Sequence, residues 1–250
     1  MNNSLILLSS REKDGFNNMS NVFMGVEEGG NHIMQYLSGS LRMYTMLGTS
    51  NSCVYPRWGI GLEVGGWANL NATKYFSPMV YGYLYGYVPG IIRTHGIKLT
   101  ATSQTRLSEN AFGQRVVKIL PRGLENAASI NSYLGNMAGT MVKLTADYAL
   151  PIYIGDLSIF KNFLYIKRMV ITPHFDYTIA DPFNQKSVVR SSIWSAGSSI
   201  TFNLESVAWI AWPCSAGVSA SINGGPMFDK YKKSFSLDRW FVGPVFSVSF

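Results

Sequence analysis

Apolar and polar side chains alternate with a period of two over long stretches of this chain. The row between residues 207 and 222 is unbroken, and its apolar members are Ala208, Ile210, Trp212, Cys214, Ala216, Val218, Ala220 and Ile222. The same alternation occurs in residues 58–67, 95–104, 141–148 and 193–204. It indicates β-strands with two different faces. Strands in soluble proteins average about 5–6 residues, whereas tilted strands that cross a membrane need about 9–11. The length of these segments therefore favours a membrane barrel over a soluble sandwich.

The composition is consistent with a surface that water does not wet. Charged residues make up 14% of the 250 residues, compared with about 25% in ordinary soluble domains, and 47% are hydrophobic. This composition excludes a disordered chain, a coiled coil and a disulfide scaffold. No apolar run approaches the roughly 18–20 residues that a membrane helix needs. A closed barrel is the other structure that satisfies backbone polar groups in hydrocarbon, so we expect one if the chain meets a membrane.

The alternating segments and the turn residues between them predict an all-β, antiparallel transmembrane barrel. The predicted strands are 38–49, 56–68, 76–88, 93–107, 138–149, 163–178, 191–204, 206–222 and 239–250, with a tenth remnant at 3–10. The long connections are 11–37, 108–137, 179–190 and 223–238. Long loops at one end and short turns at the other are typical of outer-membrane barrels. We divide the chain into a remnant strand and loop at 1–37 and barrel strands at 38–250, with the long loop 108–137 inserted.

The N-terminus, the cysteines and the net charge bear on export, on disulfide bonding and on the kind of partner that we expect. Met1–Ser10 has no basic start, no long apolar core and no cleavage site, so it is not a signal peptide, and we expect a fragment or a mature form. Cys53 and Cys214 show no metal spacing and are expected to be free thiols, the alternative being a disulfide. The net charge is +7, but the basic residues are scattered, so no nucleic-acid partner is expected.

Four tyrosines occupy every second position between residues 80 and 88. They are Tyr81, Tyr83, Tyr85 and Tyr87. One interpretation is an aromatic ladder that binds sugars or gates a pore. The other is that the rings pack over glycines of a neighbouring strand inside the barrel, and this is the interpretation that we favour.

The last ten residues, FVGPVFSVSF, resemble the C-terminal signal by which the assembly machinery recognises outer-membrane barrels. The matching positions are Gly243, Phe246, Val248 and the terminal aromatic Phe250. The resemblance implies that the barrel assembly machinery is a partner during biogenesis. Phe241 stands where such signals usually carry a polar residue.

A second motif lies in the long loop. Arg122 and Gly123 lie at the centre of a Pro-Arg-Gly-Leu segment, and five predicted strands follow the loop before the C-terminus. This resembles the barrel superfamily of bacterial surface antigens, which includes the core subunit of the barrel assembly machinery and the two-partner secretion transporters. In that family an Arg-Gly-aromatic loop tip folds into a barrel of about sixteen strands. The resemblance implies that acidic residues on the next two strands hold the arginine, and Asp147 and Asp176 match those positions. Leu124 departs from the family's aromatic.

Physical chemistry supports the same contact independently. The alternation places Asp147 on the inward, polar face of its strand. An arginine inside a lumen needs a partner, because an unpaired buried charge is costly. A guanidinium held by two carboxylates is a strong and oriented arrangement. The alternative is that Arg122 is an ordinary exposed loop residue.

These observations predict an integral outer-membrane barrel of Gram-negative type that acts in protein assembly, translocation or surface presentation. We expect no enzyme activity. His174 and Asp176 share a strand face, as a catalytic pair could, but both lie in the segment that the family resemblance already explains. We also expect no cofactor and no metal. The expected partners are outer-membrane lipid, lipopolysaccharide, and another chain or a preceding segment that completes the barrel. The alternatives are a passive channel or structural barrel with ligand-binding loops, and a soluble β-sandwich binding module.

Overall fold

The computed structural model describes eleven stretches of the chain. They are residues 4–13, 16–29, 32–49, 52–69, 78–107, 119–124, 139–159, 161, 163–180, 192–207 and 214–248. Side chains are described from residue 37 onward, except at 69, 155, 156 and 248. The described chain is almost entirely β-strand, with a single short helix. The all-β, antiparallel class predicted from the alternation is confirmed.

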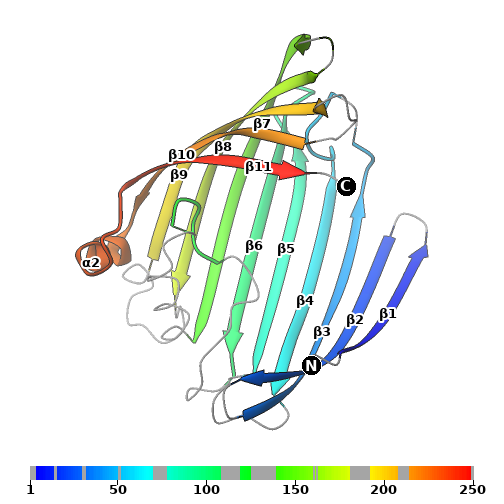
Figure 1. The fold of residues 1–250 in the computed structure, drawn as a ribbon, viewed down its shortest axis with the longest axis vertical. Coiled ribbons are helices and arrows are strands. Elements are labelled where there is room, and N and C mark those ends of the chain that lie inside the picture. The colour runs from blue at the N-terminus through cyan, green and yellow to red at the C-terminus, as the bar shows by residue number, and fades with distance from the viewer. Residues whose placement is uncertain are drawn as a thin grey trace.

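Eleven antiparallel strands form one sheet in which each strand pairs with its neighbour in the sequence. The strands are β1 (Ser4–Lys13), β2 (Phe16–Gly29), β3 (His32–Met46), β4 (Gly59–Asn69), β5 (Met79–Pro89), β6 (Gly96–Arg106), β7 (Thr140–Ile159), β8 (Leu164–Ala180), β9 (Ser192–Val207), β10 (Cys214–Gly224) and β11 (Trp240–Val248). The sheet is strongly curved, and residues 119–124 lie inside the curve (Figure 1). Among the described residues β1 and β11 do not pair, so the sheet is not closed into a barrel.

Two predicted loops contain regular structure. Residues 11–37, predicted as a loop, hold β2 and the start of β3. Their sequence does not alternate strictly, so the period-two pattern does not reveal these strands. The predicted loop 223–238 holds helix α2 (Pro226–Phe235), which has proline in its first turn, where a missing backbone N–H costs nothing. The predicted strand 206–222 begins at Cys214, and residues 208–213 lie outside the described part.

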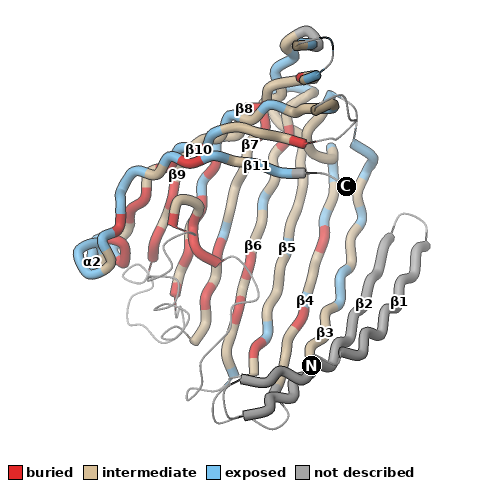
Figure 2. Tube along the Cα trace, in the orientation of Figure 1, coloured by how far each residue is buried: buried red, intermediate tan, exposed pale blue. Residues whose placement is uncertain are grey.

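The two faces of the sheet differ in chemistry. We call the face against which residues 119–124 lie the inner face. In register across β6, β7 and β8, it presents Thr102, Lys143 and Thr178. The opposite, outer face carries exposed apolar side chains on successive strands: Ile60, Val64, Leu84, Leu99, Leu144, Phe175, Ile200, Val218 and Val242. Figure 2 shows that buried positions recur along β6–β9 around residues 119–124 and at the start of α2.

Glycine allows β9 and β10 to approach closely. A Cβ at Gly217 would overlap the carbonyl oxygen of Ile200 and lie 2.7 Å from the Cα of Thr201. We expect Gly217→Val to lower the free energy of unfolding, measured by urea titration, by about 1–3 kcal/mol because the strands must separate. Gly82→Val is the matched control, since a Cβ at Gly82 meets no atom within 4 Å. Equal losses in both variants would contradict the close approach.

Candidate functional site

The site is built around residues 119–124, which we call the loop tip. Its backbone is held by side chains of two strands. Thr178 of β8 donates a hydrogen bond from Oγ1 to the carbonyl oxygen of Ile119 at 2.8 Å. Lys143 of β7 donates from Nζ to the carbonyl oxygen of Leu120 at 2.6 Å. Both carbonyls belong to an irregular segment that is not paired with a strand. These two bonds therefore satisfy buried polar groups that would otherwise lack a hydrogen-bond partner.

Arg122 binds two carboxylates on neighbouring strands. Its Nη2 lies 2.5 Å from Oδ1 of Asp147 on β7 and 2.6 Å from Oδ1 of Asp176 on β8. Its Nε donates to Oδ2 of Asp176 at 3.0 Å, and its backbone N–H donates to the same oxygen at 2.8 Å. The Asp176 side chain is 0% exposed. Arg122 therefore uses its planar donor fork and its own backbone to lock the loop tip in one orientation.

The charges around the loop tip are balanced. Lys143 Nζ lies 3.6 Å from Oδ2 of Asp176, so two cations, Arg122 and Lys143, face two carboxylates, Asp147 and Asp176. We call these four residues the inner ion-pair cluster. Burial lowers the pKa of the Arg122 guanidinium, but hydrogen bonds to Asp176 and the charge of Asp147 outweigh burial and leave that pKa above its ordinary value. Arg122 therefore stays charged in the folded protein.

Gly123 has a backbone conformation that favours glycine. Its φ is 89°, which is in the left-handed region where a Cβ is strained. A Cβ there would also lie 2.5 Å from Oγ of Ser221 and 3.2 Å from the side-chain amide of Asn223, both on β10. The loop tip thus reaches from β7 and β8, which bind Arg122, to β10, which Gly123 contacts. An Arg-Gly pair suits this position because the first residue needs a guanidinium to bind the two carboxylates and the second has no room for a side chain.

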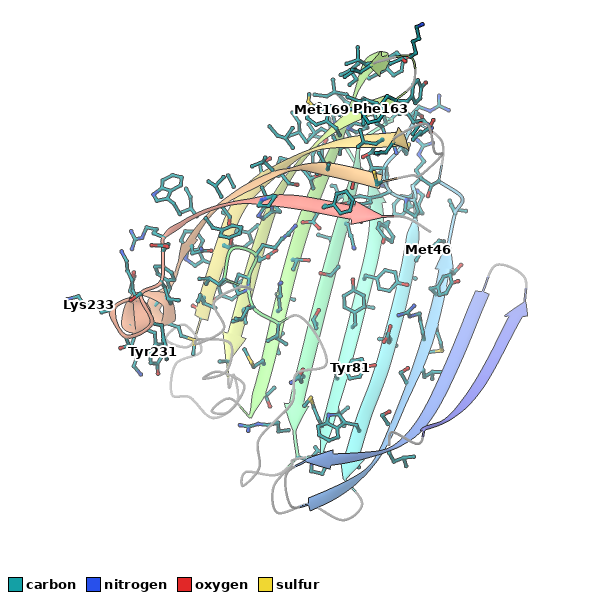
Figure 3. All side chains as sticks on the ribbon, viewed as in Figure 1. Met46, Tyr81, Phe163, Met169, Tyr231 and Lys233 are labelled. Atoms are coloured by element: carbon teal, nitrogen blue, oxygen red, sulfur yellow. The ribbon has the colours of Figure 1, made fainter. Side chains whose placement is uncertain are left out.

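An apolar cluster covers the other side of the loop tip. Phe228 of α2 is 0% exposed, and Leu124 is 2% exposed. The cluster comprises Ile119, Leu120, Leu124, Met141, Ala180, Ile193, Met227, Phe228 and Leu237, with Tyr231 and Phe235 packed against it. It joins the loop tip to the ends of β7, β8 and β9 and to α2. Tyr231 and Lys233 mark this helix at the edge of the molecule (Figure 3). Leu124 fills an apolar position here.

The structure thus brings together Arg122, Gly123, Asp147 and Asp176, which the sequence singled out. Sequence reasoning missed Lys143, Thr178 and Phe228. The signal for Lys143 was present, since it lies four residues before Asp147 and shares its face in a strand. Thr178 follows Asp176 by two residues and therefore shares its face in a strand. No local pattern predicts that α2 packs on a loop about a hundred residues earlier.

The tyrosines of β5 pack over glycines, as the second interpretation of the ladder expects. A Cβ at Gly61 of β4 would overlap the Tyr85 ring, and one at Gly65 would lie 2.6 Å from the Tyr81 hydroxyl. The Tyr81 hydroxyl also lies 3.2 Å from Oε1 of Glu63. Figure 3 labels Tyr81 beside β4. The four tyrosines therefore lie on the inner face of the sheet, where the ring centroids of Tyr83 and Tyr85 are 5.2 Å apart.

The residues of the C-terminal motif lie at the edge strand β11. Gly243 pairs with Ser219 of β10, and a Cβ at this glycine would lie 2.7 Å from the Phe241 ring. The glycine therefore leaves room for Phe241 on the inner face. Phe246 is 67% exposed on the outer face. Val248 ends the strand and pairs with Cys214, whereas Phe250 lies outside the described residues, as does most of loop 108–137.

Within the described stretches, no group of three or more potential ligands could hold a metal ion. No helix in these stretches is long and apolar enough to cross a membrane. Cys53 and Cys214 are both free in the structure, and Cys214 is buried. No family model, curated protein or solved structure matches the chain.

Proposed function

We propose that this chain forms the C-terminal wall of an outer-membrane β-barrel in which a loop, bound by the inner ion-pair cluster, closes the lumen. Its role is in protein assembly, translocation or surface presentation, as the resemblance to surface-antigen barrels implies. The observation that carries the proposal is the contact of Arg122 with Asp147 and Asp176 on the inner face of a two-faced sheet.

The exposed apolar side chains of the outer face support our proposal that this face contacts lipid. Its exposed apolar side chains run across eight strands from β4 to β11 with no covering layer among the described residues, and faces of this kind mark membrane or protein contact. Aromatic residues flank this region along β9, where Trp194 and Phe202 point to the same face. They are about 26 Å apart along an extended strand, which at the tilt of roughly 35–45° in outer-membrane barrels corresponds to about 20 Å along the membrane normal and fits within the roughly 25 Å apolar band. Outer-membrane lipid and lipopolysaccharide are therefore the proposed surroundings.

The unpaired sheet edges support a larger barrel. Among the described residues β1 and β11 each have one neighbour, and a membrane cannot hydrate their free backbone groups. We propose that further strands, from another chain or from a preceding segment, complete the barrel to about the sixteen strands of the family. The barrel assembly machinery would insert it, guided by the C-terminal motif at β11.

The decisive test is the loss of the arginine contact. In planar bilayers we expect the completed barrel with the wild-type chain to conduct little, and the same barrel with Arg122→Ala to conduct more because the loop leaves the lumen. Limited proteolysis should show faster cleavage between residues 108 and 137 in the same variant. Arg42→Ala is the matched control, because Arg42 pairs with Glu63 on the inner wall and is not bonded to the loop tip. Unchanged conductance and cleavage in Arg122→Ala would overturn the proposal.

A further inference from the structure

A histidine lies beside the inner ion-pair cluster. His174 of β8 is 5% exposed. It is paired in register with Asp147 of β7 on one side and Gly197 of β9 on the other, and Asp176 follows it by two residues on the same face. Neither ring nitrogen makes a hydrogen bond of normal geometry among the described residues, although the backbone of Thr172 lies close enough to interact with the ring. A buried imidazole without such a bond differs from the usual state of buried polar groups, which are hydrogen-bonded.

The carboxylates that face His174 already have cations of their own. From β7 they are Asp147 and Lys143, from its own strand Asp176, and from the loop tip Arg122. On β9, the register partner Gly197 and its same-face neighbours Ser195 and Ser199 carry no titratable group. Lys98 of β6 is in register with Asp147 on the inner face and adds a third cation to this row. A proton on His174 would therefore add a positive charge with no counter-charge of its own. An uncompensated charge in a buried site is costly.

We infer that protonation of His174 weakens the hold of Asp147 on Arg122 and releases the loop tip, so that the inner ion-pair cluster is an acid-sensitive latch. The inference rests on the proposed function, because it concerns the same loop. An imidazolium next to Asp147 competes with Arg122 for that carboxylate and repels the guanidinium. Both effects oppose the closed position. Histidine is the side chain whose ordinary titration falls between pH 5 and 8, so mild acid is the natural signal.

The test is limited proteolysis of the full chain in lipid vesicles at pH 7.5 and pH 5.0. Cleavage within residues 108–137 is normalised at each pH to Arg122→Ala, which defines the released state. The wild-type protein is expected to be cleaved about fivefold faster or more at pH 5.0, and His174→Phe to stay slow at both values, since it keeps a buried ring without a titrating nitrogen. His174→Gln is a second non-titrating variant, in case phenylalanine does not fit.

His95→Gln is the matched control. His95 lies in the turn before β6, where its Nδ1 is 2.9 Å from the Tyr148 hydroxyl, away from the loop tip. This variant should keep the acid response of the wild-type protein. A wild-type loop that is equally resistant at both pH values would overturn the inference, as would an acid response that persists in both His174 variants. If instead Arg122→Ala is no more sensitive than the wild-type protein at pH 7.5, the proposed function itself fails.

Discussion

Asp176→Ala is expected to lower the free energy of unfolding by about 3–5 kcal/mol, because it leaves the buried Lys143 and the half-buried Arg122 without their shared partner. The Asp176 carboxylate is fully buried and accepts hydrogen bonds from the Arg122 side chain and backbone. It also lies 3.6 Å from Lys143 Nζ. Urea titration of the protein in lipid vesicles, followed by tryptophan fluorescence, measures the loss.

Asp147→Ala is the matched comparison. This carboxylate is 13% exposed and its ion pair to Arg122 is a single short contact, so solvent can compensate for part of its loss. We expect a clearly smaller destabilisation than for Asp176→Ala, together with faster cleavage of the loop. If the two variants were equally stable, Asp176 would not be the centre of the cluster.

Phe228→Ala is expected to cost a similar amount, about 3–5 kcal/mol, since it removes a fully buried ring from the apolar cluster. The cavity would lie between α2 and the loop tip, so the helix and the loop should both loosen. Proteolysis should then detect faster cleavage in 108–137 even though the Arg122 contacts are intact. Urea titration gives the change in stability.

Phe175→Ala is the control for this variant. Phe175 is 47% exposed on the outer face of β8, away from the cluster. Its loss should leave the cleavage of the loop unchanged. Equal loop cleavage in both phenylalanine variants would contradict a specific role for α2 in holding the loop tip.

The contact between Arg122 and its carboxylates shows how far sequence reasoning reaches. Alternation along β7 assigned Asp147 to the inward face, and the cost of burying a lone arginine required a partner. The register was not accessible from the sequence: Asp147 pairs with His174, and Asp176 pairs with Thr145, so the two carboxylates sit diagonally on neighbouring strands. That diagonal lets one guanidinium reach both of them.

Helix α2 and the hairpin of β2 and β3 show where the sequence pattern fails. Residues 226–235 are rich in lysine, and in isolation they suit a solvated loop. They form a helix whose Met227 and Phe228 find buried positions only because the loop tip and β9 lie next to them. Residues 16–29 lack a clear period of two, and the neighbouring strands supply their backbone partners.

The sequence by itself determined the fold class, the two chemically different faces of the strands and the residue types of the Arg122 contact. These follow from local rules, since a period of two assigns each side chain to a face and a buried charge demands an opposite charge. The tertiary structure alone decided which strands are neighbours in register, where the loop tip lies, and that Phe228 and His174 meet it. Such contacts depend on the curvature of the whole sheet, which brings residues far apart in the chain to the same point.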